Sequence, residues 1–222
     1  MSRMTAKSSI SESTSRLDEI AACIRACRLC RDAPGAAPLP HEPRPVFRIS
    51  ATARLLVASQ APGIRVHESG LPLNDPSGDR LRQWIGVDRD TFYDELKIAI
   101  VPMGFCFPGY DELKADLPPR RECRATWHDE LFAHLPQIET ILAIGRYAQD
   151  YHFGRLGRPL PKGAGVDAIV RRWRDFEGAR PRVYALPHPS WRNSGWLKRN
   201  PWFEAEVLPV VRTEVARLTS DH

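Results

Sequence analysis

The stretch LLVASQAPGIRVHESGLPLNDPSG, residues 55–78, decides how this chain folds. Its first four residues are apolar and predict a buried strand, which the turn residues Ser59-Gln60-Ala61-Pro62-Gly63 then end. Pro62 fixes φ and Gly63 permits a positive φ, so we expect the backbone to bend sharply and to bring its amides close to a ligand. Such a loop lies at the carboxyl end of a strand, where open parallel sheets bind their ligands.

A second cluster of turn residues, GLPLNDP at positions 70–76, follows at once and contains Leu73, Asn74 and Asp75. Two rigid loops so close together predict two walls of one cleft. The simpler alternative for each residue is an ordinary connection between a strand and a helix.

Apolar runs and helical patterns alternate along the rest of the chain. The predicted strands are Leu55–Ala58, Ile98–Val101, Thr140–Ile144 and Val183–Leu186. The helical patterns cover Asp79–Ile85, Arg120–Leu135, Tyr147–Phe153, Val166–Phe176 and Pro201–Leu218. This alternation predicts an α/β fold, a three-layer αβα sandwich around a central four-stranded parallel sheet.

Length and composition indicate one folded unit of 222 residues with 42% hydrophobic content. Residues 1–14 are rich in Ser and Thr and predict a disordered tail, and residues 15–222 predict a single domain whose first helix ends near Cys27. No run is long and apolar enough to suggest a membrane span or a secretion signal, so we expect a cytoplasmic monomer. The net charge of +5 permits a polyanionic partner such as DNA.

Five cysteines in a chain without an export signal favour metal or redox chemistry over disulfides. Cys27 and Cys30 form a C-x2-C pair, and Cys106 and Cys123 could complete a set of four thiolate ligands. The wide separation of the last two favours an iron–sulfur cluster over zinc, with a structural role. The alternative is that the cysteines are small buried hydrophobic residues, which is the interpretation preferred for Cys23.

The fourth strand is followed by His188 between two prolines, and then by Ser190. Restricted in this way, and at a strand's carboxyl end, His188 is the best candidate for a preorganised hydrogen-bond donor, although a lone loop histidine is often merely exposed. Basic and aromatic residues alternate downstream. They are Trp191, Arg192, Trp196, Lys198, Arg199 and Trp202. The mixture suits phosphate contacts and base stacking, or else marks the start of the last helix with its tryptophans packed inward.

Taken together, these motifs resemble those of the uracil-DNA glycosylase superfamily, most closely its iron–sulfur branch, known as family 4. Ser59 to Gly63 is similar to the branch's G-E-A/G-P-G motif, and Gly70 to Leu73 is similar to its G-R-P-F motif at the same separation. His188-Pro189-Ser190 matches the superfamily's H-P-S motif, and the four cysteines follow the order of the cluster ligands. The resemblance implies a 4Fe–4S cluster on Cys27, Cys30, Cys106 and Cys123.

Several positions depart from the family pattern. Gln60 replaces the usual Glu, and Ala61 lacks the water-activating Asp of the family 1 motif G-Q-D-P-Y. Leu73 stands where the family stacks a Phe on the base, and Pro102 where an Asn reads the uracil edge. Asn74 could act as a substitute reader.

The resemblance implies a monofunctional glycosylase of base-excision repair, acting on flipped uracil or a related deaminated base in single- or double-stranded DNA. His188 would stabilise the departing base, and Gln60 or an acid would orient water. Of the acids Asp75 and Glu68, Asp75 is preferred, although it could simply cap the next helix.

Ala61, Pro62, Gly63, Leu73, Asn74 and Ser190 would bind the substrate. Trp191, Arg192, Lys198 and Arg199 would bind DNA. Lyase chemistry is not indicated, because no lysine lies in the motif loops. A non-catalytic nucleic-acid-binding relative with the same fold and cluster is the main alternative, and an electron-transfer protein is a third.

Overall fold

The computed structural model describes residues 2–35 and 37–220, with side chains from residue 14 onward. All four predicted strands are present, and they form one parallel sheet in the order β2-β1-β3-β4. The strands are β1 (Leu55–Ser59), β2 (Ile98–Pro102), β3 (Thr140–Ile144) and β4 (Arg182–Leu186). Each predicted strand boundary therefore lies within one residue of the observed one.

The connections between strands are helical, as the alternating pattern predicts. The helices are α1 (Ser2–Arg25), α2 (Leu29–Asp32), α3 (Ile64–Ser69), α4 (Pro76–Ile85), α5 (Arg89–Tyr93), α6 (Arg121–Cys123), α7 (Asp129–Ala133), α8 (Arg146–Arg155), α9 (Val166–Val170), α10 (Ser194–Arg199) and α11 (Leu208–Thr219). Shorter helical turns of π or 3-10 type are Arg124–His128, Arg171–Arg174, Trp191–Asn193 and Phe203–Val207.

Alternate residues of each strand face opposite layers of the sandwich. Leu56 and Ala58 of β1 point to the side covered by α1, α7 and α8, whereas Leu55 and Val57 point to the side covered by α4, α5 and α11. Burial on both faces explains why the strands are continuous apolar runs. The three-layer αβα architecture is thus confirmed, and none of the helices within the described ranges is long and apolar enough to cross a membrane.

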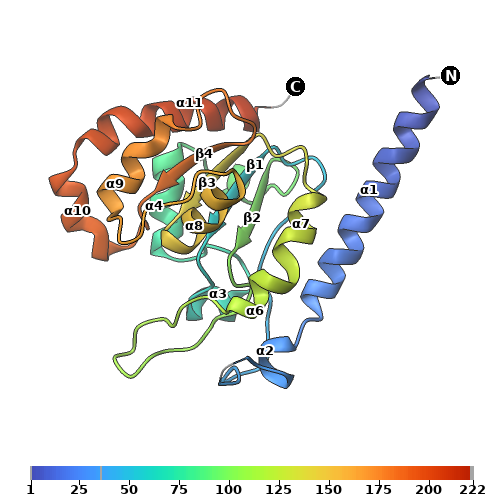
Figure 1. The fold of residues 1–222 in the computed structure, drawn as a ribbon, viewed down its shortest axis with the longest axis horizontal. Helices are drawn as coiled ribbons and strands as arrows, with labels where there is room; N and C mark the ends of the chain where they lie inside the picture. Colours follow the sequence, from blue (N-terminus) through green and yellow to red (C-terminus); the bar gives the residue numbers. More distant parts are fainter. Residues whose placement is uncertain (1, 36, 221–222) are drawn as a thin grey trace.

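The backbone of helix α1 is helical back to Ser2, and the disorder of residues 1–14 stays a prediction. No proline or glycine interrupts residues 2–25, so nothing in the sequence stops a helix that is anchored by the buried Leu17 and Ile24. Arg16 ties the helix to Glu130 of α7 at 2.6 Å, and Figure 1 shows the two helices side by side. The start of the domain at residue 15 stays a prediction, and Met1 lies outside the described residues.

Candidate active site

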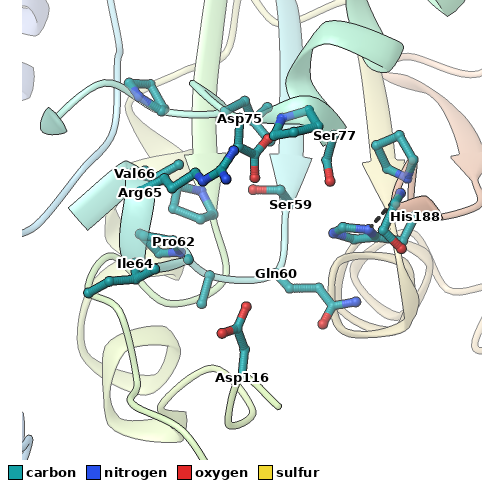
Figure 2. Close-up of a pocket in the computed structure, with 18 of the residues that line it drawn as sticks. Ser59, Gln60, Pro62, Ile64, Arg65, Val66, Asp75, Ser77, Asp116 and His188 are labelled. Atoms are coloured by element: carbon teal, nitrogen blue, oxygen red, sulfur yellow. Dashed lines mark hydrogen bonds between the residues drawn. The ribbon is translucent and has the colours of Figure 1, made fainter. Parts of the chain in front are cut away.

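A cleft of about 760 Å³ opens where β1, β2 and β4 end at their carboxyl edge. We call it the main cleft. Its walls are the loop after β1, the start of α4 with the residues before it, Pro102 at the end of β2, the hairpin at residues 109–117, and the loop after β4. A smaller hollow of about 160 Å³ adjoins it and shares Gln60, Asp116 and His188. The two rigid loops that the sequence places around one cleft do face each other (Figure 2).

His188 is held in a single orientation by its neighbours along the chain. Its Nδ1 accepts a hydrogen bond from the Ser190 backbone N–H at 3.2 Å, and the Asn193 amide donates to its carbonyl oxygen at 2.8 Å. Burial lowers the pKa of His188, with Asp75 opposing this shift and Arg192 reinforcing it. The neutral ring therefore carries its proton on Nε2, which is the nitrogen left to donate.

Gln60 continues the β1–β2 pairing beyond the strand ends. The backbone N–H of Gly104 donates to the Gln60 carbonyl at 2.9 Å, which fixes the main chain at this position. Its side-chain amide packs over Gly145, where an added Cβ would lie 2.4 Å from Gln60 Nε2. Figure 2 shows this amide beside His188 at one end of the main cleft. The two groups that the sequence assigned to catalysis thus meet, although they lie far apart in the chain.

Ala61, Pro62 and Gly63 also line the main cleft. Gly63 has φ −82°, so the positive φ that a glycine permits is not adopted at this position. The left-handed conformation occurs instead at Leu73, with φ 54°, in the second loop. This happens because Gly63 is the extended residue before α3, a helix that the sequence pattern did not reveal.

In the second loop, Leu73 lines the main cleft but Asn74 is not among its lining residues. The Asn74 side-chain oxygen instead accepts a hydrogen bond from Arg89 at 3.1 Å. Asp75 lines the cleft and also caps α4, because its Oδ1 accepts from the Gly78 N–H at 2.8 Å. The capping role considered for Asp75 is therefore present, together with a position in the cleft.

Asp116 is a cleft residue that no sequence motif indicates. It belongs to the hairpin at residues 109–117, between β2 and α6, where no motif occurs. In Figure 2 its carboxylate points toward the loop after β1, and Asp75 lies on the other side of that loop in this view. Partial enclosure by the cleft walls and the proximity of Asp75 raise the pKa of Asp116, while Arg192 opposes the shift. Lys114 of the same hairpin lines the cleft as well.

A family model described as the uracil DNA glycosylase superfamily matches residues 47–212, which is most of the chain. The chain belongs to the uracil DNA glycosylase superfamily. The match contains the motif loops that carry Gln60, Asp75 and His188. Membership supports a glycosylase-type hydrolase that acts on DNA, and the parallel α/β sheet with its flanking helices has the architecture expected of this superfamily.

In this superfamily member, only part of the basic and aromatic segment reaches the cleft. Trp191, with 76% of its surface exposed, and Arg192 line the cleft at its mouth, as does Ser190. Lys198 and Arg199 are exposed on α10 and are not among the lining residues. The remaining two tryptophans of the segment, Trp196 and Trp202, pack against the core on the α11 side, as the alternative interpretation predicted.

The four cysteines of the predicted ligand set line one small cavity, which we call the thiol cavity. Its members are Cys27, Cys30, Cys106 and Cys123, with Ile24, Leu39, Pro43, Pro45 and Phe105. A hydrogen bond between two of the thiols lowers the pKa of Cys30 to about 7 and raises that of Cys123. Within residues 2–35 and 37–220, no group of three or more His, Cys, Asp or Glu forms a site for a single metal ion.

Cys23 does not belong to this set. It is exposed, so the prediction that it packs as a small hydrophobic residue is wrong. The buried stripe of α1 runs through Leu17, Ile20, Ala21 and Ile24, and Cys23 lies beside this stripe. The family match begins at residue 47 and so leaves out Cys27 and Cys30.

Proposed function

We propose that this protein is a monofunctional DNA glycosylase that hydrolyses the N-glycosidic bond of a flipped uracil, or of a related deaminated base, in DNA. The observation that supports this most directly is the pairing of His188 and Gln60 in one cleft, with the His188 ring fixed so that Nε2 donates. A cleft of about 760 Å³ also has room for an extruded nucleotide.

The chemistry requires a donor for the departing base. As the bond between the sugar and the base breaks, negative charge forms on the base and positive character on the sugar. A neutral imidazole N–H that is already in place stabilises such charge without reorganisation, and loss of one such donor costs about 10² to 10³ in rate. Burial lowers the pKa of His188, which keeps the ring neutral at physiological pH.

The remaining cleft residues divide between water, sugar and base. Gln60 is proposed to orient water, and the cleft contains two carboxylates that could assist, Asp75 and Asp116. The segment Ala61–Gly63 and residues Leu73 and Ser190 would contact the nucleotide. Asn74 stays a proposal for base recognition that requires the second loop to shift, because Arg89 engages its side chain.

DNA outside the cleft is proposed to contact the exposed Trp191 and Arg192 first. An aromatic face beside a guanidinium suits a stacked base and its phosphate. Lys198 and Arg199 would meet the backbone further away, and we expect the protein to act as a cytoplasmic monomer.

We also propose that the thiol cavity holds a 4Fe–4S cluster, which would place the chain in the family 4-like branch. Four thiols from separate segments line one cavity whose other described lining residues are apolar residues and prolines, and four such thiols are the donor set of this kind of cluster. Its role would be structural, because it would join the turn after α1, the segment after β2, and α6. Cys123→Ser should remove iron and the broad visible absorbance near 400 nm, whereas Cys23→Ser should retain both, and equal iron content in the two variants would reject this proposal.

The test of the activity is a panel of oligonucleotides, single- and double-stranded, that contain uracil, hypoxanthine or xanthine. Abasic sites are revealed by alkali under single-turnover conditions. We expect excision of at least one base by the wild type, and a loss of about 10² or more in His188→Ala. His134→Ala, outside the cleft at the end of α7, is the matched control and should leave the rate unchanged.

Binding of these oligonucleotides without any abasic product would favour the non-catalytic alternative. Because Lys114 lines the cleft, borohydride should be added during the reaction. A trapped protein–DNA adduct would contradict the monofunctional assignment, since it would report an imine between a lysine and the sugar.

A further inference from the structure

The hairpin at residues 109–117 places a carboxylate in the main cleft from a segment outside every motif. We infer that Asp116 is the catalytic carboxylate that binds and deprotonates the attacking water, an assignment that rests on the glycosylase function proposed above. Among the described residues that line the main cleft, only Asp75 and Asp116 carry carboxylates. The choice between them follows from what each carboxylate already binds.

Asp75 is engaged in the fold. Its Oδ1 accepts the Gly78 N–H at 2.8 Å as the N-cap of α4, so one lone-pair direction of this carboxylate is committed to the helix. Asp116 receives no side-chain hydrogen bond from the part of the chain that the structure describes, so both of its oxygens are available to water. A base must be within hydrogen-bond reach of the proton that it takes, and a free carboxylate satisfies this more readily.

The backbone of the hairpin fixes where Asp116 points. Tyr110 and Asp116 pair across it as an antiparallel bridge, and the Leu117 N–H donates to the Gly109 carbonyl at 2.9 Å. The turn between them is closed by Asp111, whose Oδ1 accepts from the Leu113 and Ala115 N–H groups at 2.9 and 2.8 Å. These hydrogen bonds hold the backbone of the hairpin, and so they fix the position from which the Asp116 side chain extends.

Asp116 lies against the loop after β1. A Cβ built on Gly63 would be 3.5 Å from Asp116 Oδ2, and Asp116 borders the adjoining hollow together with Gln60, Ala61 and His188. Figure 2 shows its carboxylate directed at this loop, on the side opposite Asp75. Water held between Asp116 and the Gln60 amide would be in the same hollow that His188 borders.

The charges around Asp116 suit a base. Partial enclosure and the nearby Asp75 raise the pKa of Asp116 above its ordinary value, and Arg192 opposes the rise. A raised pKa makes the ionised carboxylate a stronger base. Arg65, Lys114 and His188 are other charged or titratable groups that line the cleft.

The step balances without any further reactant. The bond between C1′ of the sugar and the base nitrogen breaks, and its electron pair leaves with the base, whose charge is stabilised by the His188 N–H. The water oxygen forms a bond to C1′ and gives one proton to the Asp116 carboxylate. That proton is later released to solvent or to the departed base.

The experiment compares Asp116→Asn with Asp75→Asn in single-turnover excision from the best substrate of the panel. Asn is nearly isosteric with Asp and can still cap α4, so both changes remove charge with little change of fold. Glu112→Gln, an exposed site on the same hairpin outside the cleft, is the control. Binding to the same oligonucleotide with a 2′-fluoro group on the target sugar, which resists cleavage, separates chemistry from affinity.

We expect Asp116→Asn to lose about 10² or more in rate with its DNA affinity within about threefold of the wild type, as befits a general base. Asp75→Asn should lose less than about tenfold. Three results would overturn the inference: Asp116→Asn excises as fast as Glu112→Gln, Asp75→Asn loses as much rate or more, or weaker DNA binding explains the loss in Asp116→Asn. In each case, excision by the wild type still supports the glycosylase function. Absence of excision by the wild type would overturn the proposed function itself.

Discussion

Because Gly145 has no side chain, the Gln60 amide can pack directly over it. A side chain added at position 145 would displace this amide, and so it tests the role of Gln60 without a substitution of Gln60 itself. The residue follows β3 with φ +77°, and an added Cβ would lie 2.4 Å from Gln60 Nε2 and 3.2 Å from its Cδ. Gly145→Ala therefore forces the amide to move by about 1 Å to reach ordinary contact, because the end of a flexible side chain yields before backbone does. A displacement of about 1 Å at a catalytic group can cost about 10² in rate.

The same substitution also strains the backbone. Gly145 has φ +77° and ψ 166°, a conformation essentially confined to glycine. An L-residue there costs about 1–3 kcal/mol, which for a chain of this size lowers Tm by about 2–12 °C. Gly157→Ala is a control for a positive φ without a clash, since Gly157 has φ +69° and its added Cβ would meet no heavy atom of the described residues within 4 Å. Single-turnover excision and thermal unfolding should be measured on both variants.

We expect a loss of Tm in both variants, larger in Gly145→Ala, but a fall in rate of about 10² only in Gly145→Ala. If both variants excise at the wild-type rate, the position of the Gln60 amide has no bearing on the reaction. If Gly157→Ala is slowed as much as Gly145→Ala, strain rather than the amide is responsible.

Three further predictions concern packing, pH and DNA contact. Gly78→Ala should cost about 3 kcal/mol or more in urea unfolding, because its Cβ would lie 1.7 Å from the Leu73 carbonyl oxygen, whereas Gly154→Ala, with nothing within 4 Å, should be neutral or stabilising. Burial lowers the pKa of His152 to about 3, so below pH 6.5 the unfolded chain binds more protons than the folded one. The free energy of unfolding of the wild type should therefore fall by about 2 kcal/mol at this site between pH 7 and pH 5. In urea titrations at the two pH values, the fall should be smaller by that amount in His152→Leu. Trp191→Ala should weaken binding of single-stranded DNA by about 5- to 150-fold, the range of one stacked base, with an unchanged Tm.

The fold could be predicted because its strands are buried on both faces. Such strands are continuous apolar runs, and these runs also fix where the ligand-binding edge of a parallel sheet lies. His188 and Gln60 were therefore assigned to one edge without any knowledge of distances. The convergence of the four thiols followed from spacing and resemblance in the same way.

The sequence did not predict features that depend on tertiary contacts. Helix α3 has only six residues, too few for a periodic pattern, so the conformation of Gly63 was assigned as if it lay in a turn. Whether Cys23 is exposed depends on which face of α1 packs against the core. The next residue, Ile24, is on the packed face and Cys23 is not. Asp116 could not be found from the sequence, because backbone hydrogen bonds place it and the hairpin contains no recognisable sequence motif.

The thiol cavity and the main cleft share one piece of chain, and this constrains both proposals. Cys106 and Cys123 stand on either side of the hairpin that carries Asp116. At the start of this segment the Gly104 N–H is bonded to the Gln60 carbonyl, and at its end Pro119 packs so closely on Gly104 that an added Cβ would lie 3.1 Å away. A cluster bound by Cys106 and Cys123 would hold both ends of the segment together. It would thereby fix the Asp116 carboxylate relative to Gln60, although no thiol is among the described residues that line the cleft.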